Sequence, residues 1–287
     1  MSGQSIVVGI DGSPASGEAL NWAIREALVR EARLELVTVI TPELASEPEL
    51  EVGSLDAATE VLREAEAKAE AAGVPASISA VRGQPAETLI DRSEDALFLV
   101  VGTRGRGGFA GQLMGGVSST LAAHSHCPTV VVPDKDTNPM YPQRTDGIVV
   151  AVEPGLIDEA VWAGAEMAST HDLPLTLTAV RADTLGGARW LPDAYTEDPY
   201  PGEVDDLMDK TTAAVASEYP ALTIRHHVLV GNPAHLLVGA TETAELMILG
   251  TRGHSGFAGL LWGSVSQHVL QNARSITMIV RGHPTRS

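Results

Sequence analysis

The sequence predicts two α/β domains in tandem, each built as a doubly wound parallel sheet. Two observations carry this prediction. Long segments of the chain match each other at a fixed spacing, and short apolar runs of strand length alternate with helical periodicity in both halves. Such alternation is typical of a mostly parallel sheet that is covered on both faces. The 287 residues also suit two domains of about 100–200 residues each.

The repeat is clearest in two glycine-rich segments. Residues 102–118 read GTRGRGGFAGQLMGGVS, and residues 250–266 read GTRGHSGFAGLLWGSVS. Twelve of these seventeen positions are identical, at a constant offset of 148. Long ordered matches of this kind indicate a duplicated unit.

The beginnings of the two copies match at a different offset. Ile6–Asp11 corresponds to Ile148–Glu153 at an offset of 142, and a longer loop in the second copy, around Asp183–Glu203, accounts for the difference. The segment between the copies is polar and proline-containing, as linkers are. We therefore place the two domains at residues 1–136 and 145–287.

The elements of the first copy follow from local patterns. Apolar β-branched runs predict strands, and apolar residues at helical spacing predict the helices between them. Ser16 is the expected N-cap of the first helix. Strands are expected over residues 6–10, 34–40, 77–81, 97–101 and 129–132, and helices around residues 20–28, over 57–72 and 86–93, and up to about 123. The second copy repeats this order.

The last strand of each copy is short and apolar. Val130–Val132 and Met278–Val280 would invite aggregation if they were left as exposed edges. We expect them to pair with one another in antiparallel orientation, which makes the chain an internal pseudo-dimer.

Charge and composition exclude several classes of protein. The formal charge of −18 disfavours nucleic acids and anionic membrane surfaces as partners. No apolar run approaches the roughly 20 residues of a membrane span, and the N-terminus lacks the pattern of a signal peptide. Cys127 is the single cysteine, so a disulfide framework is excluded and a buried structural thiol is expected. These features predict a cytoplasmic protein.

The glycine-rich segments suit an anion such as a phosphate. Each leads from a strand into a helix, and glycine lets main-chain amides approach an anion closely. The following helix directs its N-terminal amides and the positive end of its dipole toward the same point. Arg104, Arg106 and Arg252 add positive charge. The alternative is a tight strand-to-helix turn that binds nothing.

At these residues the chain resembles the universal stress protein family in its tandem, ATP-binding form. The family motif Gly-x2-Gly-x9-Gly-(Ser/Thr) matches from Gly102 and again from Gly250, while the segment ending in Asp11-Gly-Ser13 resembles the family's opening motif and His126-Cys-Pro128 its closing one. The resemblance covers nearly the whole chain. It implies a Rossmann-like, adenine nucleotide alpha hydrolase-like fold and ATP, together with Mg²⁺, as the cofactor.

The resemblance also implies one nucleotide site in each copy. In the first copy the implied residues are Gly9, Asp11, Val39, Gly102, Thr103, Arg104, Gly105, Arg106, Gly107, Gly108, Gly115, Gly116, Val117 and Ser118. In the second copy they are Ala151, Glu153, Val180, Gly250, Thr251, Arg252, Gly253, His254, Ser255, Gly256, Gly263, Ser264, Val265 and Ser266.

Each copy departs from the family pattern. Gly116 stands where the family prefers a hydroxyl, which Ser264 supplies in the second copy. Glu153 replaces the strand-1 aspartate, and Ala151 stands where Gly9 stands in the first copy. We therefore expect two sites of unequal affinity, the first tighter because its strand-1 turn is intact.

Three classes of function remain open on the sequence. The chain is a nucleotide-binding regulatory protein of the stress response, a slow ATPase or nucleotidyl-transfer enzyme, or a duplicated scaffold with vestigial sites. Against fast catalysis, the chain lacks Gly-x4-Gly-Lys-(Ser/Thr), and its glycine loops contain no lysine. We assign no catalytic residue and no metal site made by the protein alone. A homodimer of the tandem chain and an unidentified protein partner also remain open.

Overall fold

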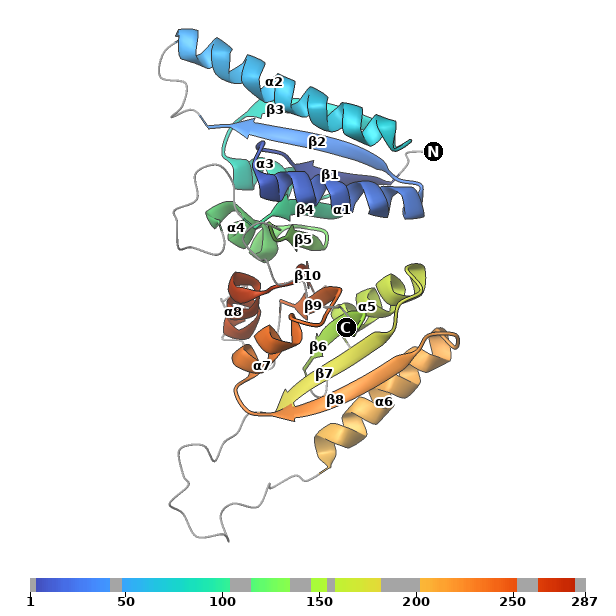
Figure 1. Cartoon of the computed structure of the whole chain (residues 1–287). Coiled ribbons are helices and arrows are strands. Elements are labelled where there is room, and N and C mark those ends of the chain that lie inside the picture. The colour runs from blue at the N-terminus through green and yellow to red at the C-terminus, as the bar shows by residue number, and fades with distance from the viewer. Residues whose placement is uncertain are drawn as a thin grey trace, which may run out of the picture. The chain divides into compact units, whose positions relative to one another are not determined.

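The computed structural model describes residues 4–41, 48–103, 115–134, 146–153, 158–181, 202–251 and 263–281. The chain divides into two compact units (Figure 1). The first consists of Met1–Met140 with Ile276–Ile279, and the second of Tyr141–Ser275 with Val280–Ser287.

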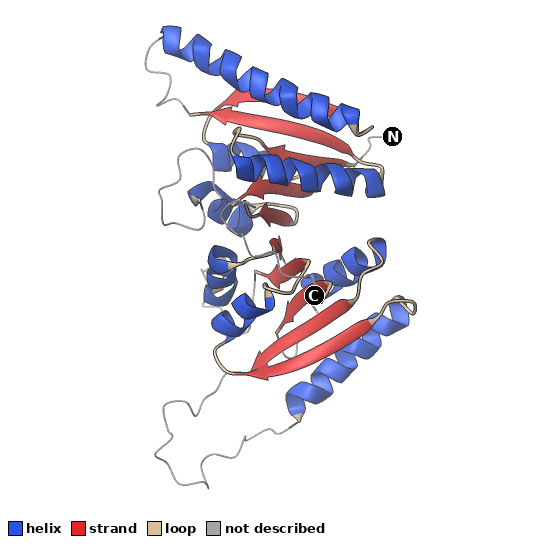
Figure 2. Ribbon diagram, viewed as in Figure 1, coloured by secondary structure: helices blue, strands red, loops and turns tan. Residues whose placement is uncertain are grey.

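In the first unit, strands and helices alternate along the chain as the sequence predicts. Its elements are β1 (Ser5–Gly9), α1 (Pro14–Arg30), β2 (Arg33–Ile40), α2 (Pro48–Ala71), β3 (Ala76–Arg82), α3 (Pro85–Arg92), β4 (Ala96–Gly102), α4 (Gly116–His124) and β5 (Thr129–Val132). Neighbouring strands are parallel, in the order β3-β2-β1-β4-β5. Helix α1 packs beside α2 and α3 beside α4, so that helices cover both faces of the sheet (Figure 2).

The second unit repeats this arrangement. Its elements are β6 (Ile148–Val152), α5 (Glu159–Thr170), β7 (Leu175–Arg181), α6 (Glu203–Glu218), β8 (Ile224–Val230), α7 (Pro233–Ala240), β9 (Leu246–Gly250) and α8 (Ser264–Asn272), followed by β10 (Ile276–Val280). Strands β8, β7, β6 and β9 lie side by side in that order and are parallel. The doubly wound fold class is therefore confirmed in both copies.

Strand β10 runs antiparallel to β5. Met278 lies opposite Val130, and Thr277 lies opposite Val131. These residues of β10 belong to the first unit. The antiparallel pairing of the two short apolar strands is thus the one that the sequence predicts.

The core is formed where both faces of a strand are covered. In β1, Ile6, Val7 and Val8 are fully buried, although consecutive residues of a strand point to opposite faces. The burial of both faces explains why the central strands are apolar throughout. Among the described helices, none is long and apolar enough to cross a membrane.

The start of α1 corrects one expectation. The N-cap is Ser13, whose hydroxyl accepts a hydrogen bond from the amide of Ser16, and Ser16 itself lies inside the helix. Pro14 occupies the first helical position, where its fixed φ suits the helix and its missing N–H costs nothing. The expected cap at Ser16 was therefore three residues too late.

The start of α2 is also earlier than expected. The helix begins at Pro48 rather than Ala57, although it ends at Ala71, within one residue of the predicted end. Gly73, with φ of +83°, follows the helix. Gly53 lowers the helix propensity of the first turns, which is why the composition pointed to a later start.

A buried hydroxyl joins the same two elements in both copies. The Ser93 hydroxyl accepts a hydrogen bond from the amide of His126 at 2.8 Å. At the same offset of 148 as the glycine segments, the Thr241 hydroxyl accepts from the amide of Arg274 at 3.0 Å. Both hydroxyls are almost fully buried, so the duplication extends to internal polar contacts that the sequence matches did not single out.

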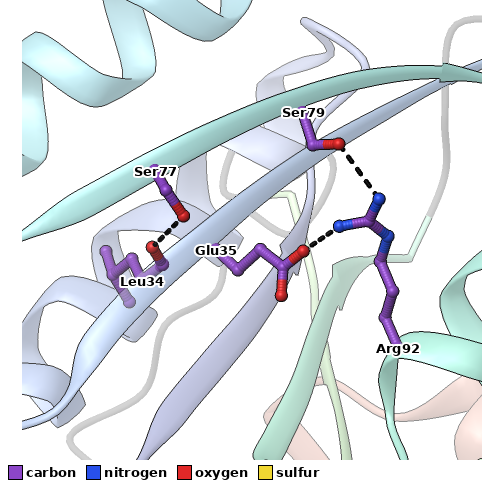
Figure 3. Close-up of polar contacts among 5 residues, drawn as sticks. All are labelled: Leu34, Glu35, Ser77, Ser79 and Arg92. Atoms are coloured by element: carbon purple, nitrogen blue, oxygen red, sulfur yellow. Dashed lines mark hydrogen bonds and ion pairs between the residues drawn. The ribbon is translucent and has the colours of Figure 1, made fainter. Parts of the chain in front are cut away.

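The C-terminal end of α3 is fixed to the sheet by a contact found in the first copy. Figure 3 shows the Arg92 guanidinium between Glu35 on β2 and Ser79 on β3. It forms an ion pair with Glu35 and donates to the Ser79 hydroxyl at 3.0 Å. This contact ties the C-terminal end of α3 to the amino half of β2 and to the middle of β3.

Candidate functional site

The candidate site of the first copy lies where the sheet reverses its direction of winding. Strands β1 and β4 are neighbours, but the chain leaves β1 toward β2 and leaves β4 toward β5. The connections that follow their carboxyl ends therefore run in opposite directions, and open α/β sheets bind ligands at such a point. The turn after Gly9 and the segment after Gly102 both begin at this edge.

The turn after β1 is held by its own side chains. The Asp11 carboxylate accepts a hydrogen bond from the amide of Ser13 at 3.0 Å. Gly12 has a φ of +75°, a conformation that favours glycine. The side chain of Thr38 donates to the carbonyl of Ile10 at 2.7 Å. These contacts fix the acidic side chain at the end of β1.

Two glycines at this edge are needed for packing. A Cβ at Gly102 would lie 2.7 Å from the carbonyl carbon of Ala15, in the first turn of α1. A Cβ at Gly9 would lie 3.0 Å from a methyl group of Val101. The close approach of strand and helix thus explains Gly102 without any ligand.

The base of the first glycine loop is closed by a main-chain hydrogen bond. The amide of Gly115 donates to the carbonyl of Thr103 at 2.8 Å, and the amide of Thr103 donates to Val132 on β5. Residues 104–108 and their counterparts 252–256, which the family motif assigns to the nucleotide, lie outside the described residues.

The serine at the end of each motif bonds to the protein itself. The Ser118 hydroxyl donates to the carbonyl of Gly102 at 2.9 Å, and Ser266 makes the equivalent bond to Gly250 at 2.8 Å. A hydroxyl has only one proton to donate. In this conformation Ser118 and Ser266 therefore hold helix to strand, and their hydroxyl protons do not point to a ligand.

Helices α4 and α8 begin differently from α1 and α5, the helices that follow the first strand of each copy. Ser13 caps α1 and Asp158 caps α5. Gly115 and Gly263 stand at the cap positions of α4 and α8, and no side chain within the described residues caps either helix. The first-turn amides of α4 and α8 thus keep the partial positive charge that attracts anions.

Main-chain groups at the end of β2 face the same edge. The carbonyl of Val37 accepts from the amide of Ile10 on the β1 side, and the carbonyl of Ile40 accepts from Gly83 on the β3 side. Because these directions alternate along a strand, the main chain of Val39 faces the β1 side, beyond the end of that strand at Gly9. In the second copy the carbonyl of Arg181 accepts from Gly231 on the β8 side. The main chain of Val180 therefore faces the β6 side, as that of Val39 faces the β1 side.

The second copy brings together a different set of side chains. Ala151 lies on β6 and Glu153 directly follows that strand. The cap of the next helix, Asp158, lies seven residues after Ala151, whereas Ser13 lies four residues after Gly9. The turn is therefore longer, and it ends in a carboxylate next to Gly250.

Asp158 is the site residue that the sequence reasoning missed. The offset of 142 between the first strands of the two copies pairs Asp158 with Ser16. Because the turn of the second copy is longer, Asp158 is instead the counterpart of Ser13, the cap of α1. The available signal was the run Asp158-Glu159-Ala160, because an aspartate followed by an acidic residue is a typical helix start.

Fold and site together define the class of protein. It is a tandem of two doubly wound α/β domains, each with a glycine-rich segment and, at the switch point of its sheet, a helix that no described side chain caps. The sequence profile of the universal stress protein family matches residues 3–133 and again residues 145–281. The chain belongs to the universal stress protein family.

Relatives of the same tandem length support this assignment. A universal stress protein of Mycobacterium tuberculosis (strain ATCC 25618 / H37Rv) is 33% identical over 294 residues, covering 98% of this chain and 97% of the relative. One of Mycolicibacterium smegmatis is 29% identical, covering 96% of each chain. The crystal structure of a universal stress protein from Archaeoglobus fulgidus covers 98% of this chain and 99% of its own, with a TM-score of 0.72 at 19% identity. That structural likeness shows the shared fold.

Proposed function

We propose that the chain binds an adenine nucleotide, ATP together with Mg²⁺, at the carboxyl edge of each sheet and acts as a nucleotide-dependent regulatory protein. The observation that carries this proposal is the contrast between the two helix N-termini that follow the switch-point strands of each sheet. Helices α1 and α5 are capped by side chains, whereas α4 and α8 begin at Gly115 and Gly263, where no described side chain caps them. An anion at these two positions would satisfy the first-turn amides.

The residues of the first site suit each part of the nucleotide. The amides of Gly116 and Val117, in the first turn of α4, would hold phosphate oxygens. The main chain of Val39, past the end of β1, would meet the adenine edge, and the fixed Asp11 turn would lie between base and phosphates. Mg²⁺ would enter with the nucleotide, since the described residues contain no cluster of three metal-binding side chains.

A regulatory function requires that bound ATP persists, so that its hydrolysis must be slow. Fast phosphoryl transfer needs a residue that positions the attacking water. The first glycine segment offers only Gln112, which the sequence places on the far side of a helical turn, and the second offers only His254. We expect turnover far below about one per second, near the slow end of unassisted nucleotidases. A single-turnover assay with radiolabelled ATP and Mg²⁺ measures this rate directly. A faster rate would favour the enzyme.

A charged cap tests the proposed phosphate site at a position where the backbone accepts any residue. Gly115 has a φ of −80° and ψ of 156°, which suit any residue. In Gly115→Asp the carboxylate would cap α4 and repel phosphate. We expect the thermal midpoint to stay the same or rise, because aspartate is a favoured N-cap, while one equivalent of bound ATP is lost. Calorimetry and native mass spectrometry of the full chain measure both effects.

Gln84→Asp is the matched control. It adds the same charge at the N-cap of α3, which also has no side-chain cap among the described residues but follows β3, away from the switch point. ATP binding should be unchanged in this variant. Gly263→Asp should remove the second site in the same way. Full ATP binding by the double variant of Gly115 and Gly263 would contradict the proposal.

A further inference from the structure

The two proposed nucleotide sites differ in the charge of one helix cap. In each copy the first glycine of the loop packs against the start of the helix that follows the first strand. Gly102 faces Ala15, two residues after the neutral cap Ser13. Gly250 faces Ala160 and the cap itself, which is Asp158. A carboxylate thus stands in the second site where the first has a hydroxyl.

The two oxygens of Asp158 have different roles. Oδ1 accepts hydrogen bonds from the amides of Ala160 at 3.1 Å and Val161 at 3.3 Å. Oδ2 lies beside Gly250, since a Cβ built on that glycine would be 2.8 Å from it. One oxygen therefore caps α5, and the other places negative charge against the first residue of the loop.

The surroundings of Asp158 are already unfavourable for negative charge. Burial raises the pKa of its carboxyl above the ordinary value, and the charges of Glu159 and Glu153 raise it further. The amides of Val161 and Ala160 act in the opposite direction and lower this pKa. A phosphate brought to Gly250 would add like charge to a partly desolvated place, where repulsion is stronger than in water.

We infer that Asp158 is a specificity-determining residue, which makes the second site select against nucleotides in proportion to their phosphate charge. The inference rests on the proposed function. Both sites take ATP, but relative to ADP, AMP and adenosine the second site binds ATP more weakly than the first site does. The tandem chain thus carries two copies of one pocket with different ligand preference.

Charge removal at the cap tests the inference. Asp158→Asn keeps a good N-cap but removes the charge, and Asp158→Ser reproduces the first copy. In a Gly115→Asp background, where only the second site remains, calorimetry at pH 8 would compare the four ligands without metal. We expect Asp158→Asn to raise the affinity for ATP about ten-fold, with smaller gains for ADP and AMP and less than about two-fold for adenosine.

The reciprocal change in the first site is the matched experiment. In a Gly263→Asp background, Ser13→Asp should lower ATP affinity about ten-fold, while Ser13→Asn should leave it nearly unchanged. Equal gains for all four ligands, or none for ATP, in Asp158→Asn would overturn the inference. A loss of ATP affinity in Asp158→Asn, in a parallel titration with Mg²⁺, would overturn it too, because the carboxylate would then be a cation ligand.

The experiment separates this inference from the proposed function. If ATP binds both sites and Asp158→Asn changes nothing, only the inference fails. If no variant and no unaltered chain binds any of the four ligands, the proposed function fails and the inference falls with it.

Discussion

The hydroxyl of Ser118 donates to the main-chain carbonyl of Gly102 at 2.9 Å and lies 3.4 Å from that of Thr103. This contact ties the first turn of α4 to the end of β4, where the glycine loop begins. Because Ser118 is almost fully buried, Ser118→Ala would remove a hydrogen bond at a place with little access to water. We expect a loss of about 0.5–1.5 kcal/mol in the free energy of unfolding, measured by urea denaturation.

Thr120→Ala serves as the control for that prediction. Thr120 lies on the same helix, and its hydroxyl donates to the carbonyl of Gly116 at an exposed position. Its removal should change the free energy of unfolding by less than about 0.5 kcal/mol. Equal stability of the two variants would mean that the Ser118 contact does not stabilise the fold.

Two glycines of the first loop motif should respond oppositely to alanine. In Gly102→Ala the new Cβ would lie 2.7 Å from the carbonyl carbon of Ala15, and the overpacking should cost about 1–3 kcal/mol. In Gly116→Ala no described atom lies within 4 Å of the new Cβ, and the residue is the first of α4. That variant should be neutral or gain about 0.4–1 kcal/mol. Thermal unfolding of both variants checks the contrast, and a stable Gly102→Ala chain would refute it.

The sequence predicts the architecture well because the architecture follows from repeated, local patterns. The strand over Thr129–Val132 has the predicted bounds, and β4 differs from prediction by one residue at each end. A parallel sheet needs strands that are apolar on both faces, and such runs are recognisable without the rest of the fold. The location of the glycine loops at the sheet's carboxyl edge follows from the same alternation.

The orientation of the Ser118 hydroxyl and the position of the Asp158 cap depend on tertiary contacts, which local sequence patterns do not predict. The motif assigns Ser118 to the nucleotide, but the structure directs its hydroxyl proton to Gly102, because strand and helix approach closely there. Asp158 lies beside Gly250 because the preceding turn is longer than in the first copy, and a fixed offset pairs it with Ser16. Hydroxyl orientation and cap position are decided by packing rather than by periodicity.

The single cysteine should be unreactive in the folded chain. Cys127 is 8% exposed, and burial raises the pKa of its thiol to about 12. Only on the order of 10⁻⁴ of the thiol is then ionised at pH 8, and the thiolate is the reactive form. A thiol reagent should therefore react slowly with Cys127 in native buffer. When urea unfolds the first unit, one thiol per chain should react. Complete reaction within seconds in native buffer would contradict the burial of Cys127.

The last prediction concerns stability and pH. Burial, with the charges of Glu159 and Glu153, raises the pKa of Asp158 above its ordinary value of 3.8. The folded chain therefore binds this proton more tightly than the unfolded chain does. The resulting stabilisation is fully present below pH 3.8 and is lost as the pH rises through the raised pKa.

Relative to Asp158→Asn, which has no such proton, the unaltered chain should lose stability as the pH rises from about 4 toward neutrality. Glu159→Gln removes one of the charges that raise this pKa and should confine the loss to a lower and narrower pH range. Urea denaturation of the three chains at a series of pH values measures these differences. If the stability of the unaltered chain relative to Asp158→Asn instead rose with pH, the Asp158 carboxylate would be stabilised by the amides of Ala160 and Val161 more than burial destabilises it.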